Sequence, residues 1–294
     1  MTREARPLVF LGTPTAAATI LSELIRSGFE IAHVITRADA RRGRGSSITP
    51  SPVKQVAIDN AIDVSHDMAW LKENSNRELL GVVVAFGKII PASVLSQTPM
   101  INVHFSLLPR WRGAAPVERA ILAGDARSGV CIMNVEETLD TGEVFAQREI
   151  NIVDTHTVET LTADLAALGA ELLVETLNVG LGVGVPQLGE TTYATKVSAE
   201  ELRLDWNLSS IEVSRRVRAV RSYTMLDSQR LKVIRTELVT DMPQLLPGQC
   251  DGAGIVGTCD GAVRLVSVQP EGKAVMDAAA WLRGRSDHGI IQFS

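Results

Sequence analysis

Apolar runs alternate with amphipathic helical patterns in the first part of the chain. Leu8–Leu11 is a short apolar run, and from Ala16 to Ser27 the apolar positions recur at helical spacing. Gly28 ends this pattern, and Ile31–Thr36 forms the next apolar run. A strand, a helix and a second strand in this order predict a βαβ unit, in which the two strands lie parallel in one sheet.

The alternation of strand and helix patterns continues well beyond this unit. Apolar and amphipathic patterns predict four further strands and a long final helix, at Gly81–Ala85, Ile101–His104, Val130–Val135, Glu143–Ile150 and Thr157–Val179. We therefore expect an α/β fold with a Rossmann-like, mostly parallel sheet in an N-terminal domain that spans residues 1–181.

The pattern changes at Gly180–Gly189, a segment rich in Gly and Val. Beyond it, a helix is predicted near Ser209–Val220, followed by short β-rich pieces separated by Gly, Pro and Asp. Such short strands favour a smaller C-terminal β-barrel domain of the OB-like kind. We place a linker at residues 182–200 and this second domain at residues 201–294.

The composition is that of an ordinary globular protein, with 45% hydrophobic and 21% charged residues. The N-terminus carries charges of both signs, and no run of about eighteen apolar residues occurs. We therefore expect a cytoplasmic protein without a membrane span. The three cysteines are widely spaced and form no CxxC pair, so we expect neither a disulfide framework nor a structural zinc site.

Positive charge is concentrated in two places of an acidic chain. The net charge of −5 argues against broad, non-specific binding of nucleic acid. Two local clusters of arginine are nevertheless consistent with a polyanionic partner. They are Arg37, Arg41, Arg42 and Arg44, and Arg215, Arg216, Arg218 and Arg221. The first cluster lies in a polar segment, 37–52, that is too long for an ordinary connection, and loops of this size are often functional.

The turn after the first strand excludes one common function of α/β sheets. It reads Gly12-Thr13-Pro14 rather than GxGxxG, and no acidic residue closes the next strand. Because dinucleotide binding of the Rossmann type relies on both features, we exclude a nicotinamide enzyme.

Three residues form a candidate catalytic group. Asn102 and His104 are two residues apart at the end of a predicted strand, so their side chains share one face at the edge where open α/β sheets bind ligands. An amide donor beside an imidazole suits a developing oxyanion. Asp140 lies in a glycine-containing turn that could place its carboxylate beside His104, where it would favour the imidazolium. Each residue taken singly is more often structural, but their conjunction in this order is specific.

Two motifs carry a resemblance to a known family. Residues 102–116 read NVHFSLLPRWRGAAP and residues 139–142 read LDTG, which together resemble the signature of the folate-dependent formyltransferases. Four further segments are similar to the members of that family that act on methionyl-tRNA, namely LGTP at 11–14, RGRG at 42–45, PSPVK at 50–54 and YATKVSAEELRLDW at 193–206. The similarity extends over nearly the whole chain in the family's order.

The resemblance implies a role for each matching residue. It implies that Asn102, His104 and Asp140 are the catalytic trio, and that no metal takes part. It implies two folate-binding segments, one that lines the tetrahydrofolate site and one whose backbone meets the pterin ring, namely Ser106, Leu107, Leu108 and Pro109, and Ala85, Phe86, Gly87, Lys88 and Ile89.

The resemblance also implies the substrates and the division of labour between domains. The formyl donor would be 10-formyltetrahydrofolate, bound by the N-terminal catalytic domain, and the acceptor would be the amino group of initiator methionyl-tRNA. The basic loop with Arg41, Arg42 and Arg44 would contact the tRNA acceptor stem, and the C-terminal barrel would bind tRNA. The family also leads us to expect a monomer.

The sequence departs from the family pattern in three places. Phe105 stands where the family usually has a small residue, and Ser46-Ser47 follow RGRG in place of the usual lysines. The segment 221–227 replaces a proline-rich turn.

Three alternatives to this function remain open. The chain could formylate another amine, such as glycinamide ribonucleotide or an amino sugar, because those relatives share the Asn-His-Asp core. It could be a non-catalytic homologue that binds folate or RNA, or a hydrolase that releases formate to water.

Overall fold

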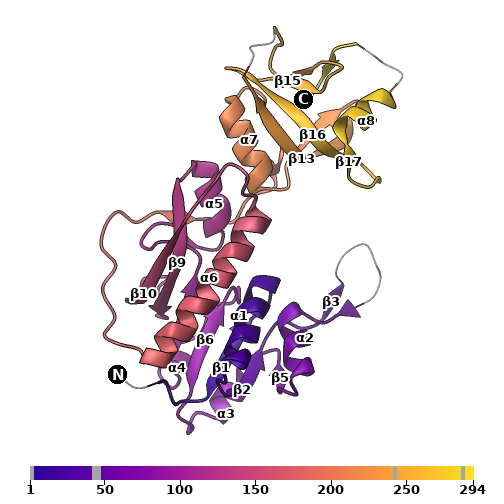
Figure 1. The fold of residues 1–294 in the computed structure, drawn as a ribbon. Coiled ribbons are helices and arrows are strands. Elements are labelled where there is room, and N and C mark those ends of the chain that lie inside the picture. Colours follow the sequence, from indigo (N-terminus) through magenta and orange to yellow (C-terminus); the bar gives the residue numbers. More distant parts are fainter. Residues whose placement is uncertain (1–2, 42–47, 241–243, 286–288) are drawn as a thin grey trace. The chain divides into compact units, whose positions relative to one another are not determined.

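The computed structural model describes residues 3–41, 48–240, 244–285 and 289–294, which form two compact units, each with its own sheet (Figure 1). The first unit consists of Met1–Pro116, Ala126–Ile152 and Glu159–Thr195. The second unit consists of Val117–Asp125, Val153–Val158 and Lys196–Ser294. Two segments that lie between parts of the first unit in sequence therefore belong to the second unit in space.

The sheet of the first unit has seven strands in the order β10-β9-β7-β6-β1-β2-β5. The five neighbouring strands β7, β6, β1, β2 and β5 are parallel to one another. Strand β9 is antiparallel to β7, and β10 is antiparallel to β9. This arrangement confirms the predicted Rossmann-like, mostly parallel sheet. The strand bounds are β1 Leu8–Gly12, β2 Ile31–Ile35, β5 Val64–Ser65, β6 Leu80–Val84, β7 Met100–His104, β9 Arg127–Asn134 and β10 Val144–Asn151.

Helices cover the sheet and explain why its central strands are continuously apolar. Every residue of β1 is buried, as expected for a strand with neighbours on both sides and side chains packed above and below. In Figure 1, the long helix α6 runs along the face of the sheet that is turned to the viewer, and its Gly169 faces Val103 of β7. The helices in the first part of the chain are α1 Thr15–Arg26, α2 Pro52–Asp59, α3 Ala69–Glu73, α4 Ala92–Leu95, α5 Pro116–Ala123 and α6 Val158–Val179.

The segment after α6 pairs with strands of the first unit. Val185 exchanges two backbone hydrogen bonds with Val144, each of 2.9 Å. Further along, β11 (Tyr193–Ala194) pairs in parallel with β8 (Arg112–Gly113). Much of the segment that we predicted to be a linker, 182–200, is therefore fixed along the first unit.

The sheet of the second unit is antiparallel, nearly closed and barrel-like, which confirms the predicted smaller β-domain. Its main strand order is β12-β13-β16-β15-β14-β18, with β17 paired to β16. Met225 and Ser294 exchange two backbone hydrogen bonds, of 2.9 and 3.1 Å, which join β12 to the chain beyond β18 and nearly close the sheet. The strand bounds are β12 Tyr223–Leu226, β13 Gln229–Val239, β14 Gln249–Cys250, β15 Ile255–Gly257, β16 Ala262–Pro270, β17 Met276–Asp277 and β18 Ile291–Gln292.

Two aromatic residues help to fill the barrel. Trp206 stacks on Phe293 with ring centroids 5.7 Å apart and donates from Nε1 to Thr224 Oγ1 at 3.0 Å. The segment 221–227, which departs from the family pattern, supplies β12, and the positive φ angles of Asp227 and Ser228 turn the chain into β13. The remaining helices are η1 Glu200–Leu202, α7 Ser210–Ala219 and α8 Ala278–Arg283.

Two contacts attach the inserted segments to the second unit. Arg119 of α5 pairs with Glu201, and hydrogen bonding from this guanidinium lowers the pKa of the Glu201 carboxyl to about 2. Arg218 of α7 donates to the carbonyl oxygen of His156 at 2.9 Å. These pairs join residues that are far apart in sequence.

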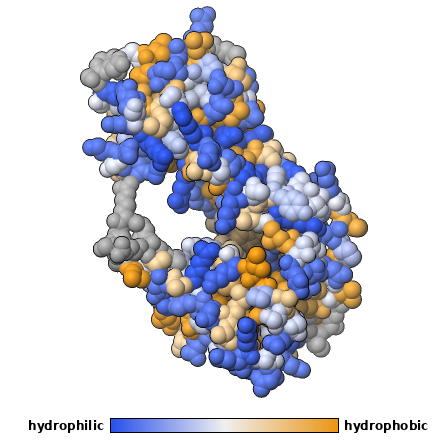
Figure 2. Space-filling model, turned by 180° about the vertical axis from the view of Figure 1, so that it is seen from behind, coloured by the Kyte–Doolittle hydropathy of each residue, from blue (hydrophilic) through white to orange (hydrophobic). Residues whose placement is uncertain are grey.

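The surface carries polar and apolar side chains together, and the cysteines are not paired. On the face seen in Figure 2, apolar side chains are interspersed among hydrophilic ones. All three cysteines are free. None of the helices in the described ranges has the length and apolar character that a membrane span requires.

His33 is a buried histidine in the first unit. Its side chain is 3% exposed, stacks on Trp70 at 4.3 Å and contacts Ser65 Oγ through Nε2 at 2.9 Å. Burial lowers the pKa of His33 from its ordinary value, and the charge of Asp63 opposes this only in part. The folded protein therefore keeps the ring neutral at a pH at which the unfolded chain binds a proton.

We expect this histidine to reduce stability in acid. As the pH falls below about 6.5, the ordinary histidine pKa, the unfolded state gains a proton that the folded state does not bind. The free energy of unfolding should therefore fall more between pH 8 and pH 5 in the wild type than in His33→Phe, as measured by urea denaturation. Equal losses in the two proteins would contradict this role of His33.

Candidate active site

His104 lies at the carboxyl end of β7 with both ring nitrogens facing oxygen atoms. The residue is 5% exposed. Its Nε2 lies 2.9 Å from the carbonyl oxygen of Trp111, and its Nδ1 lies 3.7 Å from Oδ2 of Asp140. Because a carbonyl oxygen can only accept, Nε2 carries a hydrogen and donates it to Trp111. The other ring nitrogen, Nδ1, faces the carboxylate from beyond normal hydrogen-bonding distance.

The carboxylate of Asp140 is fixed by a backbone donor. Its Oδ2 accepts a hydrogen bond of 2.7 Å from the amide of Gly113, so one oxygen lies between that amide and the His104 ring. Asp140 has a φ angle of 51°, in the left-handed region that aspartate tolerates better than most residues. The sequence predicted that this turn would bring the carboxylate beside His104, and the two side chains do lie together.

Gly142 allows the turn to lie against β9. A Cβ atom at this position would overlap the backbone oxygen of Asn134. The turn that carries Asp140 can therefore approach β9 closely only with glycine here.

Asn102 lies two residues before His104 on β7 and is partly exposed. Within the described residues its side-chain amide has no hydrogen-bond partner. Its N–H groups are therefore available to a ligand at the sheet edge where His104 ends the strand.

The segment 105–110 uses most of its side chains for packing. Ser106 Oγ donates to the carbonyl oxygen of Arg110 at 2.6 Å, and Leu108 packs with Cys131 and Met133. Pro109 is buried, and Phe105 is also buried, at 8% exposed. Within residues 105–109, a ligand would therefore meet the partly exposed Leu107 and the backbone more than the other side chains, whereas Arg110 is exposed.

The segment 85–89 presents peptide groups outside the sheet beside the end of β7. It follows β6, which is parallel to β7 with Val83 opposite Asn102. Ala85 and Gly87 have positive φ angles, of 44° and 69°, and Phe86 is buried between them. Within the described residues, the peptide groups of this segment make no backbone–backbone hydrogen bond. Apart from the Gly87 carbonyl, which accepts from Arg37, these donors and acceptors are left for a ligand, and they suit a flat heterocycle with polar edges.

Two side chains hold this segment in place. Arg37 donates from Nη2 to the carbonyl oxygen of Gly87 at 3.3 Å, and Lys88 donates from Nζ to the carbonyl oxygen of His66 at 3.0 Å. Ile89 is 86% exposed. The segment therefore presents an apolar side chain to solvent on a fixed backbone.

The structure describes only part of the first arginine cluster. Arg41 belongs to β3 (Ala40–Arg41), which pairs with β4 (Ile48–Thr49) at the base of the basic loop. Arg42, Arg44 and Ser46-Ser47 lie outside the described residues.

The second arginine cluster is partly committed to internal contacts. Arg218 binds the carbonyl oxygen of His156, and Arg216 donates to the carbonyl oxygen of Glu201 at 3.3 Å. These two arginines have less freedom to contact a phosphate than the sequence suggested.

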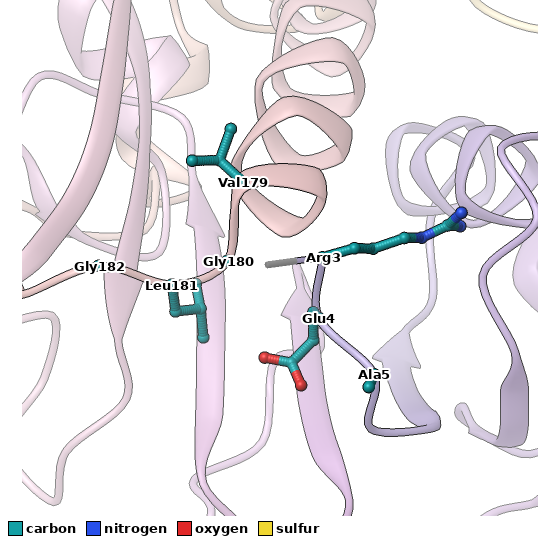
Figure 3. Close-up of a pocket in the computed structure, with 7 residues that line it drawn as sticks. All are labelled: Arg3, Glu4, Ala5, Val179, Gly180, Leu181 and Gly182. Atoms are coloured by element: carbon teal, nitrogen blue, oxygen red, sulfur yellow. The ribbon is translucent and has the colours of Figure 1, made fainter. Parts of the chain in front are cut away.

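Figure 3 shows a separate hollow, lined by Arg3–Ala5 and Val179–Gly182. These residues lie near the amino end of β1, whereas His104 ends the parallel strand β7 at the carboxyl edge. The carboxylate of Glu4 is already bound to Arg6 at 2.8 Å. The hollow is therefore not part of the candidate site.

Sequence reasoning missed two backbone groups that contact the trio. It assigned no role to the Trp111 carbonyl or the Gly113 amide, although both contact the predicted trio. Among the residues that the structure describes, no group of three or more His, Cys, Asp or Glu side chains is placed to hold a metal ion.

Comparison with known families identifies both parts of the chain. Residues 6–177 match the family described as "Formyl transferase", and residues 196–286 match "Formyl transferase, C-terminal domain".

Curated relatives match over nearly the full length. The chain is 40% identical to a methionyl-tRNA formyltransferase from Corynebacterium aurimucosum, over 95% of this chain and 94% of the relative. It is 41% identical to the methionyl-tRNA formyltransferase of Clavibacter sepedonicus, over 97% and 99% of the two chains.

A solved structure shares the fold. HypX from Aquifex aeolicus, in complex with tetrahydrofolic acid, has a TM-score of 0.64 and 17% sequence identity to this chain. The match covers 94% of this chain and 46% of the longer HypX chain.

We expect Gly142→Ala to destabilise the first unit. The added Cβ would overlap a backbone oxygen of β9, so the turn must shift, at a cost of about 1–3 kcal/mol in the free energy of unfolding. Gly252→Ala is the matched control, because nothing lies within 4 Å of its Cβ position. Urea denaturation of both variants measures the difference, and equal stabilities would show that the turn does not need glycine.

Proposed function

The chain belongs to the formyl transferase family, and we propose that it transfers the formyl group of 10-formyltetrahydrofolate to the amino group of methionyl-tRNA. The observation that carries this proposal is the group at the end of β7, where an unpaired Asn102 amide lies near a His104 ring flanked by Asp140. The two relatives at 40% and 41% identity, both named methionyl-tRNA formyltransferase, support the acceptor.

The residues at the carboxyl edge fit a folate. Apart from the Gly87 carbonyl, the peptide groups of 85–89 offer donors and acceptors to a pterin ring, and the neighbouring edge is lined, largely through the backbone, by Ser106, Leu107, Leu108 and Pro109. The HypX structure that shares this fold binds tetrahydrofolic acid, which supports the same class of ligand here. We infer that the formylated form is the donor, because the trio suits attack on a carbonyl carbon.

The donor supplies a formyl group whose carbon the methionyl amine attacks. Asn102 donates a hydrogen bond to the formyl oxygen as negative charge develops on it. The Nε2–H of His104 is occupied by Trp111, so the ring donates to that oxygen from Nδ1. At 3.7 Å from Nδ1, Asp140 Oδ2 is too distant to take this hydrogen in a normal hydrogen bond.

Asp140 therefore acts on the ring chiefly as a charge. Its carboxylate favours the positively charged imidazolium without occupying the donor that the formyl oxygen needs. We assign to the same carboxylate the acceptance, through water, of the proton that the attacking amine loses. The bond between the formyl carbon and N10 of the folate then breaks, and N10 takes up a proton as tetrahydrofolate leaves.

The acceptor would be bound by basic residues outside this group. We propose that Arg41, Arg42 and Arg44 of the basic loop contact the acceptor stem, and that the domain spanning 201–294 binds the tRNA body. Phosphate contacts of this kind position a nucleic acid without reading its sequence. We further propose that the enzyme is cytoplasmic, where initiator methionyl-tRNA is used, and that it is a monomer.

We expect Asn102→Ala to be nearly inactive while remaining folded. Loss of one oxyanion donor lowers kcat by roughly 10²–10³. The assay measures formylation of charged initiator methionyl-tRNA with 10-formyltetrahydrofolate. Asn151→Ala is the matched control, because Asn151 is an exposed asparagine at the end of β10 and should keep full activity.

The outcome of this assay separates the competing functions. More than half of the wild-type rate in Asn102→Ala would remove Asn102 from the mechanism. A folded wild type that formylates glycinamide ribonucleotide or an amino sugar, and not methionyl-tRNA, would overturn the proposed acceptor. Formate released without any amine would indicate a hydrolase, and folate binding without turnover would indicate a non-catalytic homologue.

We expect the basic loop to act on tRNA alone. Replacing Arg41, Arg42 and Arg44 together by alanine should raise the KM for methionyl-tRNA and leave the KM for the folate unchanged. In a plot of the logarithm of the tRNA KM against the logarithm of the salt concentration, the slope should fall by about one for each phosphate that the variant no longer binds. Arg26→Ala, an exposed arginine on α1, is the control, and an unchanged slope in the triple variant would exclude the loop from tRNA binding.

A further inference from the structure

Gln187 lies in the segment after α6 and binds two parts of the active site at once. Its Nε2 donates to the carbonyl oxygens of Asp140 and Gly142, at 2.9 and 2.8 Å. Its Oε1 accepts from Nε and Nη2 of Arg112, at 3.0 and 2.7 Å. All four hydrogen-bonding positions of the amide are therefore used.

These bonds join the turn that carries Asp140 to the segment that carries Gly113. The same two segments are joined a second time, because Asp140 Oδ2 accepts from the amide of Gly113 at 2.7 Å. Trp111, two residues before Gly113, supplies the carbonyl that binds His104 Nε2. Gln187 thus connects the two segments that flank the His104 ring.

Gln187 itself is held on both sides. Val185, two residues before it, exchanges two backbone hydrogen bonds with Val144 of β10. Beyond it, Thr192 Oγ1 accepts from the amide of Trp111 at 2.9 Å, and β11 pairs with β8. The side chain therefore projects from a backbone that is fixed to the first unit and can set the position of a neighbouring turn.

The turn needs such support because of its own conformation. Asp140 has a φ angle of 51°, a left-handed conformation that aspartate tolerates better than most residues but that still costs more than it would for glycine. Without Gln187, the carbonyls of Asp140 and Gly142 would each lose a hydrogen-bond donor. The turn would then be held less firmly in the position that sets the distance between the carboxylate and His104.

We propose that Gln187 is a positioning residue for formyl transfer, acting through Asp140. This inference rests on the proposed function of the trio. It requires an amide at position 187, because only an amide donates to the two carbonyls and accepts from Arg112 at the same time. A carboxylate would keep the bond to Arg112 and lose both donors, and a leucine would lose every bond.

The variants Gln187→Leu and Gln187→Glu test the proposal, with Leu188→Ala as the matched control. Leu188 is the next residue and is 83% exposed, so its truncation should leave kcat unchanged. Both Gln187 variants should lower kcat by roughly 10- to 100-fold, since small displacements of a catalytic group have effects of this size. The KM for 10-formyltetrahydrofolate should change less than about twofold, as expected when a group acts on the transition state alone.

A double-mutant cycle separates positioning from a general structural role. If Gln187 acts through Asp140, then Gln187→Leu should lower kcat by less than about twofold when added to Asp140→Ala. A full additional loss in that background would overturn the proposal, and so would a single Gln187→Leu variant with the wild-type kcat.

A second measurement does not depend on turnover. The amide hydrogen of Gly113 is protected by Asp140 Oδ2, so its exchange with solvent reports whether the carboxylate is in place. Exchange at Gly113 should be faster in Gln187→Leu than in Leu188→Ala. If the wild type fails to formylate methionyl-tRNA, the proposed function fails by itself, and this exchange rate still decides whether Gln187 positions Asp140.

Discussion

A buried imidazole with an oxygen atom facing each ring nitrogen requires two segments of chain to be held in place together. The Trp111 carbonyl binds His104 from one side, and the Asp140 carboxylate faces it from the other. Because Oδ2 of the carboxylate lies 3.7 Å from Nδ1, outside normal hydrogen-bonding distance, this ring nitrogen is left for a ligand beside a negatively charged group. The parallel sheet supplies the fixed edge from which this arrangement is built.

Side-chain chemistry could be predicted from the sequence, and backbone chemistry could not. Asn102, His104 and Asp140 were chosen as candidates because their types and order carry a meaning, and the structure places His104 and Asp140 side by side. Apolar runs predicted β1, β6 and β7. The Trp111 carbonyl and the Gly113 amide have no side-chain signature, since every residue except proline offers both groups. The short strands β8 and β11, of two residues each, are also invisible to periodicity.

Charge counted along the chain overstates the charge that a partner can meet. Arg216 and Arg218 look like part of a basic face in the sequence, but in the structure they bind carbonyl oxygens of Glu201 and His156. Arg218 thereby helps to hold Val153–Val158, a segment from the middle of the chain, within the second unit, and Arg216 holds the chain at Glu201. Whether an arginine can bind a partner or is already bound within the protein depends on contacts between residues far apart in the sequence. The spacing of residues along the chain does not reveal such contacts.

The interleaving of the two units bears on how such proteins can change over generations. The second unit contains most of α5 and Val153–Val158, and both of these segments come earlier in the sequence than Glu159–Thr195, the last part of the first unit. A recombination event near Lys196 that replaced the C-terminal part would separate Arg119 from Glu201 and His156 from Arg218. The two parts are therefore inherited most safely together, and a substitution in α5 is under selection from a barrel that is encoded about 80 residues later.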